Sequence, residues 1–138
     1  QATMDFSIQQ HLFSSLKDAG YHIGIITNDS DSSTALFLSL MGLQQYIDFV
    51  ASRESHYKRK PHPQAFFEFC TRFSLTPCQV AMVGDTLTDM LFARKAGAGY
   101  RIGVLSGSND ARRLERHSDI VYPNISALLD DNRLFSSN

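Results

Sequence analysis

Apolar residues alternate along the chain between helical spacing and short unbroken runs. Helical spacing predicts helices at residues 6–19, 32–41, 65–73, 87–96 and 110–116, and a last helix that begins within 125–129. Unbroken apolar runs predict strands at residues 21–27, 49–51, 79–83, 100–105 and 119–122. A glycine directly follows three of the expected helices and is a typical stop signal, at Gly20, Gly42 and Gly97.

This alternation of strands and helices favours an α/β fold with a mostly parallel sheet. Helices cover both faces of such a sheet, so we expect a three-layer, Rossmann-like core with buried strands. At 138 residues the chain has the length of one domain, and we expect residues 1–138 to form a single one. Ligands of these folds bind beyond the carboxyl ends of the strands, so the polar residues there are the candidates for chemistry.

The charge balance and the cysteine count narrow the expected partners and location. Thirteen Lys and Arg against fourteen Asp and Glu give a formal net charge of −1. We therefore expect neither nucleic acid nor a membrane surface as a partner, because both call for an excess of basic residues. The two cysteines, Cys70 and Cys78, are too few for a disulfide framework. Reduced thiols and the absence of a visible leader indicate a cytoplasmic protein.

The first polar strand end is the segment Thr27-Asn28-Asp29-Ser30, which precedes an expected helix. A hydroxyl, an amide and the free N–H groups of a helix start could together bind an anion. Residues 29–33 are also all good helix caps, and on this segment alone a capping role is favoured. Both interpretations can hold at the same time.

The second candidate is Lys60, which stands before Pro61 in the sequence Lys-Pro-His-Pro. Proline disfavours the helical region for the residue before it, so this lysine is held in an extended backbone. An ammonium group presented in this way suits a phosphate or a carboxylate. The alternative is one more solvated base in a basic loop, and His62 is expected to be a surface turn residue rather than a ligand.

The third candidate is the segment from Gly84 to Asp89, which follows an expected strand. Gly84 permits a tight turn. Asp85 lies at the strand end, and Asp89 lies four residues later on the same side of the next helix. Two carboxylates at a strand end suit a hard cation such as Mg²⁺. In the alternative, Asp85 caps the helix and Asp89 is a solvated charge of its first turn.

Taken together, the three segments resemble the motifs of the haloacid dehalogenase (HAD) superfamily of phosphotransferases and hydrolases. The residues that match its second, third and fourth motifs are, in that order, Thr27, Lys60, and Gly84 with Asp85 and Asp89. Residues 93–98 and 102–104 also look like a helix and the fifth strand of phosphoglycolate phosphatase-like members. The resemblance extends from about residue 12 to about residue 129.

The resemblance implies Mg²⁺-dependent hydrolysis of a small phosphomonoester, through an aspartyl-phosphate, by the intact enzyme. It implies that Asp85 and Asp89 form the metal site, with Asp89 also orienting Lys60. Lys60 would neutralise the charge of the nucleophile and the phosphate. The Thr27 hydroxyl and the Asn28 amide would hold phosphoryl oxygens. These roles fit the chemistry, because phosphoryl transfer depends mainly on positioning and electrostatic stabilisation.

The family's first motif, Asp-x-Asp on the first strand, has no match in this sequence. Asp5 is the nearest candidate for the nucleophile, but Ser7 stands where the second Asp belongs, and too few residues precede Asp5 to form a strand. We expect Asp5 to cap the first helix instead. We therefore expect the chain to be the carboxyl-terminal part of a longer enzyme, with no cap domain visible and no activity by itself.

The family's first strand lies in the middle of the sheet, so the expected fold is an HAD core that lacks its central strand. The strands at 21–27 and 79–83 would then each have an unpaired edge. Unsatisfied buried backbone groups cost roughly 1–3 kcal/mol each. We expect the place to be filled by a second chain, by the missing N-terminal segment, by residues 1–5, by strand exchange in a dimer, or by a rearranged sheet.

A non-catalytic module with the same fold, which binds a partner or an anion, is the alternative to a phosphatase. An Asp-x-Asp motif encoded upstream would favour the enzyme. A receiver domain also has acids and a lysine at its strand ends. It fits less well, because there the acidic pair comes first and the lysine last.

Overall fold

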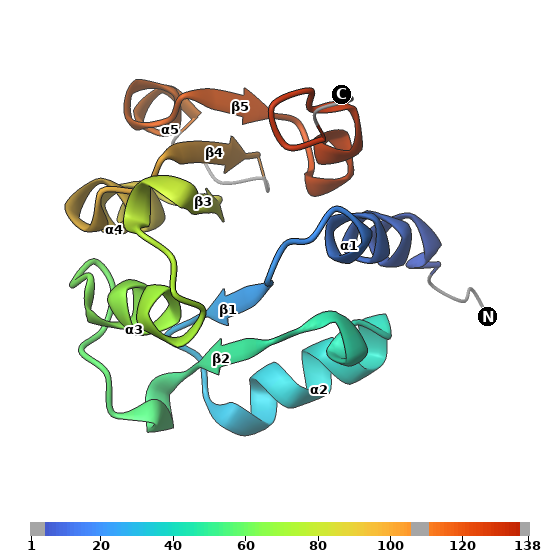
Figure 1. The fold of residues 1–138 in the computed structure, drawn as a ribbon, viewed down its shortest axis with the longest axis horizontal. Coiled ribbons are helices and arrows are strands. Elements are labelled where there is room, and N and C mark those ends of the chain that lie inside the picture. Colours follow the sequence, from blue (N-terminus) through green and yellow to red (C-terminus); the bar gives the residue numbers. More distant parts are fainter. Residues whose placement is uncertain (1–4, 106–110, 136–138) are drawn as a thin grey trace. The chain divides into compact units, whose positions relative to one another are not determined.

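The computed structural model describes residues 5–105 and 111–135, and the chain divides into two compact units (Figure 1). The first unit comprises residues 1–54 and 125–138, and the second comprises residues 55–124. Helices alternate with parallel strands in both units, which confirms the predicted α/β class.

The first unit is built on a two-stranded parallel sheet. Its elements are, in chain order, α1 (Ser7–Asp18), β1 (Gly24–Ile26), α2 (Asp31–Met41), the 3₁₀-helix η1 (Gln44–Tyr46), β2 (Phe49–Ala51) and the 3₁₀-helix η4 (Ile125–Asp130). A further 3₁₀-helix, η2 (Arg53–Ser55), follows β2. The register of β1 and β2 pairs Ile25 with Val50. The helices α1 and η4 pack together, and Leu12 of α1 and Leu128 of η4 are both buried.

The helix ends of the first unit follow from local chemistry. Ser30 is the N-cap of α2, and its hydroxyl oxygen accepts a hydrogen bond from Ser33 N at 3.1 Å. Gly42 ends α2 in the left-handed region with φ 67°, which glycine adopts without steric cost. Asp5 accepts a hydrogen bond from Ser7 N at 2.9 Å, although Phe6 is the N-cap residue of α1. Asp5 thus satisfies one free N–H at the start of this helix, as expected, but the prediction that it is the cap residue is wrong by one position.

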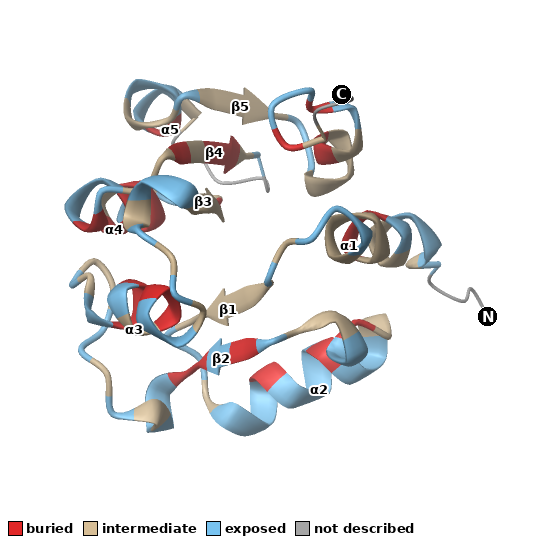
Figure 2. Ribbon diagram, in the orientation of Figure 1, coloured by how far each residue is buried: buried red, intermediate tan, exposed pale blue. Residues whose placement is uncertain are grey.

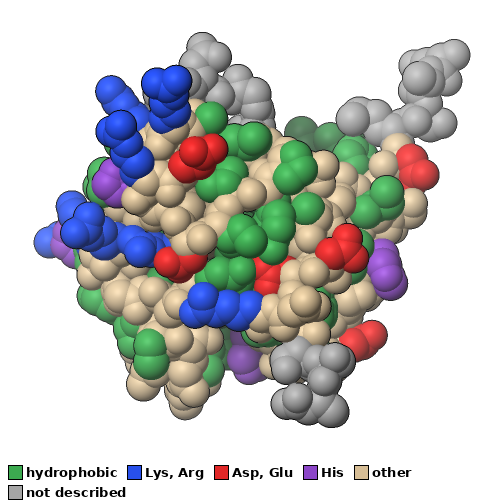
Figure 3. All heavy atoms as spheres, turned by 90° about the horizontal axis from the view of Figure 1, so that it is seen from above, with side chains coloured by type: hydrophobic (Ala, Val, Ile, Leu, Met, Phe, Trp, Pro, Cys, Tyr) green, Lys and Arg blue, Asp and Glu red, His purple; other side chains and the backbone are tan. Residues whose placement is uncertain are grey.

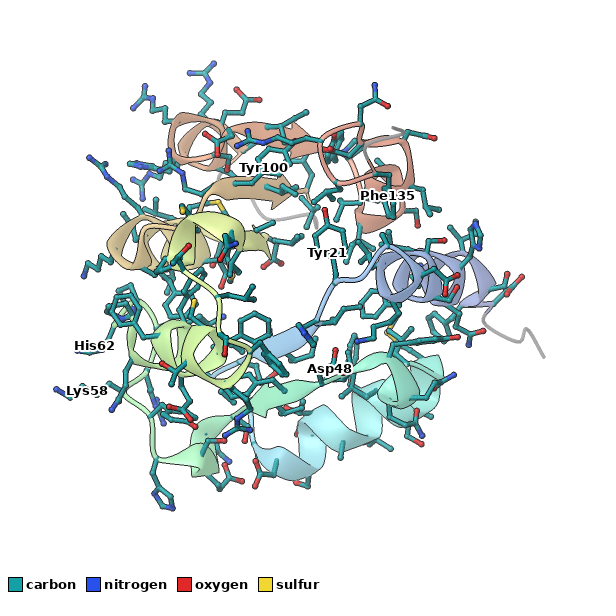
Figure 4. All side chains as sticks on the ribbon, in the orientation of Figure 1. Tyr21, Asp48, Lys58, His62, Tyr100 and Phe135 are labelled. Atoms are coloured by element: carbon teal, nitrogen blue, oxygen red, sulfur yellow. The ribbon has the colours of Figure 1, made fainter. Side chains whose placement is uncertain are left out.

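A hydrogen bond ties the carboxyl-terminal segment to the rest of the first unit. Tyr21 extends toward this segment in Figure 4, and its hydroxyl donates to Leu134 O at 2.6 Å. Asp131 accepts from the N–H groups of Arg133 and Leu134, which folds the segment back on itself. Burial, with a smaller contribution from the charge of Asp131, raises the pKa of Tyr21 above its ordinary value.

The second unit is built on a three-stranded parallel sheet with the order β3-β4-β5. Its elements are α3 (Gln64–Arg72), the 3₁₀-helix η3 (Pro77–Gln79), β3 (Ala81–Gly84), α4 (Leu87–Ala96), β4 (Tyr100–Val104), α5 (Ala111–His117) and β5 (Ile120–Tyr122). Phe66 of α3 and Phe92 of α4 are fully buried, with their rings edge to face at 5.8 Å between centroids. This aromatic pair fixes α3 against α4.

Several elements differ from the sequence prediction. The strand expected at 21–27 forms a ladder only over Gly24–Ile26, and the start of the run at 79–83 belongs to η3. The last helix is a 3₁₀-helix, not an α-helix. Residue 110, the expected start of a helix, lies outside the described residues; α5 begins at Ala111.

The prediction that the apolar strands are buried is wrong for three of them. All three residues of β1 and of β5, and the first three of β3, are only half-buried (Figure 2). The physical reason is that each of these strands has a neighbour on one side only, which is β2 for β1 and β4 for β3 and β5. The strands form two separate sheets, so pairing of β1 with β3 in a rearranged sheet is not observed among the described residues.

An ion pair joins α1 to the edge of the two-stranded sheet. The Asp48 carboxylate contacts Lys17 Nζ and accepts from Ile23 N at 2.8 Å, while Asp48 N donates to Ile23 O at 2.8 Å. Partial burial raises the pKa of Asp48, but the hydrogen bond from Lys17, the hydrogen bond from Ile23 N and the nearby positive charges together outweigh it. The net result is a pKa below the ordinary value of 3.8.

We predict that Asp48→Asn lowers the free energy of unfolding by about 1–2 kcal/mol at neutral pH, because it removes a charged acceptor from one backbone N–H. A carboxyl with a depressed folded-state pKa stabilises the fold above its unfolded pKa, and this stabilisation is lost as the pH falls below about 3.8. Urea unfolding across that pH range measures both effects.

The matched control is Asp18→Asn, a substitution at the exposed end of α1. It is expected to change the free energy of unfolding by less than about 0.5 kcal/mol. Equal pH profiles for the wild type and Asp48→Asn would contradict the role of Asp48.

Candidate functional site

The polar site of the second unit begins where β3 ends. Gly84 closes the strand, Asp85 follows it, and Thr86 is the N-cap of α4. The Thr86 hydroxyl oxygen accepts from Asp89 N at 3.1 Å. Asp85 therefore lies just before the cap residue. The alternative in which Asp85 itself caps the helix is wrong.

Asp89 is the centre of this site. It is only 7% exposed, and each of its two carboxylate oxygens accepts a hydrogen bond. Oδ1 accepts from Lys60 Nζ at 2.7 Å, and Oδ2 accepts from Asp85 N at 3.2 Å. The alternative of a solvated first-turn charge is therefore wrong: this carboxylate connects the lysine to the backbone of the strand end.

Gly84 makes the position of Asp89 possible. A Cβ atom at residue 84 would lie 2.3 Å from Asp89 Cβ and 2.7 Å from Oδ2. Such a contact is far inside van der Waals distance, so any side chain at this position would displace Asp89. The glycine of the Gly-Asp-x-x-x-Asp pattern is thus explained by space around the second aspartate.

Lys60 reaches Asp89 from a loop that is fixed on both sides. Lys58 N donates to Gln64 Oε1 at 2.6 Å, and His62 N donates to Arg59 O at 3.0 Å. The peptide bond between Lys60 and Pro61 is cis. Lys58 and His62, both exposed, point outward in Figure 4, whereas the Lys60 side chain is 13% exposed. The alternative of a solvated base is therefore wrong for Lys60, and the predicted surface position of His62 is confirmed.

Packing beneath the site holds its parts together. The loop of Lys60 leads into α3, Asp89 stands on α4, and the Phe66–Phe92 ring pair joins these two helices. Met90, next to Asp89, is fully buried. The lysine and the carboxylate therefore meet because the apolar faces of two helices are packed together.

The other predicted site residues belong to the first unit. Thr27 directly follows β1, and its N–H donates to Ala51 O at 2.9 Å. Its Oγ1 accepts from Asp29 N at 3.1 Å, and the hydroxyl proton can still be donated to a ligand. Asn28 is exposed. The structure thus brings Lys60, Asp85 and Asp89 together, while the convergence of Thr27 and Asn28 with them stays a prediction.

The expected capping function at the start of α2 is confirmed. Ser30 caps the helix, and Asp31 N donates to Glu54 Oε1 at 3.1 Å. A second backbone bond, from Arg53 N to Asp29 O at 2.8 Å, fixes the same loop. The side chains of Ser30 and Glu54 thus satisfy two backbone N–H groups at the start of α2. The Thr27 hydroxyl and the Asn28 amide remain as the candidate groups for an anion.

Sequence reasoning missed two residues of these sites, Thr86 and Glu54. Thr86 stands three residues before Asp89 and matches the Ser/Thr-x-x-Asp/Glu pattern of a helix start, so this pattern could have found it. Glu54 lies 23 residues from its partner Asp31, and no local signal indicates that contact.

The donor set of the second unit fits Mg²⁺ in part. Mg²⁺ is usually held by one or two carboxylates together with water and substrate oxygens. The Asp85 carboxylate at the strand end fits such a role. Both Asp89 oxygens already accept hydrogen bonds from protein groups, which suits a residue that positions the site better than one that binds the ion directly. Among residues 5–105 and 111–135, no group of three or more His, Cys, Asp or Glu could hold a metal.

A buried lysine paired with Asp89, with Asp85 at the end of the parallel strand β3, is the arrangement that the family comparison has to explain. The sequence pattern of the family described as "Haloacid dehalogenase-like hydrolase" matches residues 5–102. The chain belongs to this family. Among the described residues, no helix is long and apolar enough to span a membrane.

Curated relatives include phosphoglycolate phosphatases. The chain is 32% identical to that of Nitrosospira multiformis over 111 residues, which are 80% of this chain and 48% of the relative. It is 34% identical to that of Thiobacillus denitrificans, over 79% of this chain and 48% of the relative. The chain thus spans about half the length of the curated relatives it matches.

Solved structures have the same fold. A HAD phosphatase from Thermococcus onnurineus matches with a TM-score of 0.74 at 26% identity, covering 90% of this chain and 54% of that protein. A hydrolase from Pseudomonas syringae matches with a TM-score of 0.80 at 24% identity, covering 97% of this chain and 61% of that protein. The HAD-type, Rossmann-like core predicted from the sequence is therefore confirmed.

We predict that Lys60→Met and Asp89→Asn are strongly coupled. Removing one partner of a largely buried ion pair leaves an uncompensated charge, so Lys60→Met should lower the free energy of unfolding by about 3 kcal/mol. In a double-mutant cycle the two substitutions should show a coupling energy of about 1–3 kcal/mol. Chemical unfolding of the four proteins measures it.

Lys58→Met is the matched control, because Lys58 lies in the same loop but is exposed. We expect it to change the free energy of unfolding by less than about 0.5 kcal/mol. A coupling energy near zero between positions 60 and 89 would show that the pair does not form in solution.

Proposed function

We propose that the complete protein is a Mg²⁺-dependent phosphatase that hydrolyses a small phosphomonoester through an aspartyl-phosphate. The observation that carries the proposal is the buried Lys60–Asp89 pair, with Asp85 beside it at the carboxyl end of β3. Family membership supports a hydrolase, and the names of the curated relatives support a substrate such as phosphoglycolate. A cytoplasmic location belongs to the same proposal.

Asp85, Asp89 and Lys60 of the second unit have different roles in the proposed reaction. Asp85 supplies a carboxylate oxygen to Mg²⁺. Bound Mg²⁺ would stabilise negative charge on the phosphoryl oxygens. Asp89 fixes the direction of the Lys60 ammonium and the backbone of Asp85, and so acts as a positioning residue; direct binding of the metal by Asp89 stays a prediction. Lys60 lowers the electrostatic cost of bringing an anionic nucleophile to an anionic phosphate.

The residues of the first unit bind the phosphoryl group. The Thr27 hydroxyl can donate a proton to one phosphoryl oxygen while its own oxygen accepts from Asp29 N. The Asn28 amide donates to a second oxygen. The nucleophilic aspartate and its neighbouring acid come from a part of the protein outside these 138 residues, and the relatives' greater length supports this.

We predict that Asp85→Asn lowers kcat/KM of the full-length protein by about 100-fold or more, because it removes a carboxylate from the metal. Hydrolysis of phosphoglycolate, assayed over a range of Mg²⁺ concentrations, is the measurement. Asp130→Asn is the control, an exposed carboxylate at the end of η4, and should leave kcat/KM unchanged.

Two outcomes would contradict the proposal in different ways. Hydrolysis that needs no Mg²⁺ and is unaffected by Asp85→Asn would remove the metal role. If the full-length protein hydrolyses no phosphomonoester but binds one saturably, it is a binding module that keeps the fold without the chemistry.

We also propose that a strand from the rest of the protein pairs with β1 and β3. Ile23 O and Thr27 N form hydrogen bonds on the side of β2. Because the backbone groups of successive residues alternate between the two edges of a strand, those of Gly24 and Ile26 face the other edge. Val80 O accepts from Gly99 N, and the same alternation turns Ala81 and Val83 away from β4. Half-buried edges of this kind favour the addition of a strand.

Hydrogen exchange tests this second proposal. In the full-length protein the amides of Gly24, Ile26, Ala81 and Val83 should be as protected as those of Ile25 and Met82, because an added strand would bond to them. Fast exchange confined to these four amides would show that both edges stay open. If copies of the protein exchange this strand instead, the protection of the four amides would depend on protein concentration.

A further inference from the structure

Basic residues are concentrated in the second unit, although the whole chain has a net charge of −1. Residues 55–124 contain ten Lys and Arg against six Asp and Glu, whereas the first unit contains three against eight. The expectation that nucleic acid is not a partner depended on the average over the chain. The distribution of charge in the structure gives a different picture.

Five of these cations form one basic surface on α4 and α5. Their side chains are exposed, and the two helices pack against each other. The members of the basic surface are Arg94, Lys95, Arg112, Arg113 and Arg116. In Figure 3, Lys and Arg side chains gather at the left of the face shown, the side on which α4 and α5 lie in Figure 1.

The packing of α5 explains why its arginines face outward. At 100° per residue, Arg112, Arg113 and Arg116 fall within one arc of about 100°, and Leu114 lies on the opposite side. Leu114 is 1% exposed and packs on Gly103 of β4, where a Cβ would come within 2.8 Å of its side chain. One buried leucine thus sets the orientation of three arginines.

Ion pairs among residues 5–105 and 111–135 do not account for this surface. The five ion pairs among the described residues include none of its members. Arg94 and Lys95 suit the last turn of α4, where the helix dipole favours cations. Arg112 and Arg113 stand in the first turn of α5, where the dipole disfavours them, and no acidic residue accompanies them in that turn.

The α4 part of the basic surface is separate from the proposed phosphatase site. Asp89 is in the first turn of α4 and Lys95 is in its last, six residues later, which is about 9 Å along the helix axis. Arg94 and Lys95 therefore do not contact a phosphate held beside Lys60. An external anion is the candidate ligand of this surface.

We propose that the basic surface binds the phosphate backbone of double-stranded nucleic acid without sequence preference. Four of its five cations are arginines, whose planar guanidinium groups match phosphate. None of the large exposed hydrophobic side chains of the described residues belongs to α4 or α5. The surface therefore lacks both the apolar anchors of membrane binding and the aromatic platforms that stack on single strands.

Fluorescence anisotropy of the full-length protein with a labelled 20-base-pair duplex tests the proposal. Each neutralised phosphate contributes about −0.9 to the slope of log Kobs against log salt, so five contacts give a slope of about −4.5. The triple substitution R112Q/R113Q/R116Q should reduce the magnitude of the slope by about 2.7, and Arg113→Gln alone by about 0.9. Because all three positions are exposed, the thermal unfolding midpoint should stay the same.

The matched control removes three charges elsewhere in the second unit, with K58Q/R59Q/R72Q, and should leave the slope unchanged. Equal losses in the two triple variants would overturn the proposal, because binding would then depend only on net charge. Absence of duplex binding, or binding to phosphatidylserine vesicles in its place, would overturn it as well. Asp85→Asn should not affect duplex binding, which separates this surface from the phosphatase site.

Discussion

The Asp89 carboxylate, which is almost fully buried, is the constraint on which the polar end of the second unit depends. A buried charge is tolerated only when it is paired and hydrogen-bonded. Lys60 supplies the opposite charge, and the backbone of Asp85 supplies a second donor. Because these donors come from two different segments, one side chain determines where the lysine loop and the strand end lie. Gly84 provides the space this needs.

The two sheets show the same need for partners, here at the edges of whole strands. β1 and β3 each have a partner on one side and half-buried apolar residues that ordinarily lie inside a parallel sheet. The chain spans about half the length of its curated relatives, and these two edges are where the proposed additional strand would pair. The local helix–strand units are nevertheless formed, because their apolar faces pack against neighbours within each unit.

Charge is a further property that an average over the sequence conceals. A net charge of −1 describes the whole chain, while the structure separates an acidic first unit from a basic second unit. On α5, the burial of Leu114 turns the arginines to one side. The sequence lists these residues, but only packing decides that they share a face.

Local chemistry made much of the structure predictable. Apolar periodicity and the glycines at positions 42 and 97 identified α2 and α4, because both helices end at a left-handed glycine. The candidate residues at positions 60, 85 and 89 were recognisable from short motifs at strand ends. The lengths of the strands were not predictable, because a strand exists only where a neighbour bonds to it, and β1 is reduced to three residues by this rule.

The sequence by itself therefore determined the class of fold, the order of elements and the types of residue available for chemistry. The fold class, the element order and the available residue types follow from apolar periodicity, from turn residues and from the chemistry of individual side chains. All of these are local properties of the sequence. Only the tertiary structure decided that Asp89 is enclosed by Lys60 and the backbone of Asp85, rather than solvated on its helix. Lys60 and Asp89 lie 29 residues apart, and the packing of Phe66 on Phe92 is what brings their segments together.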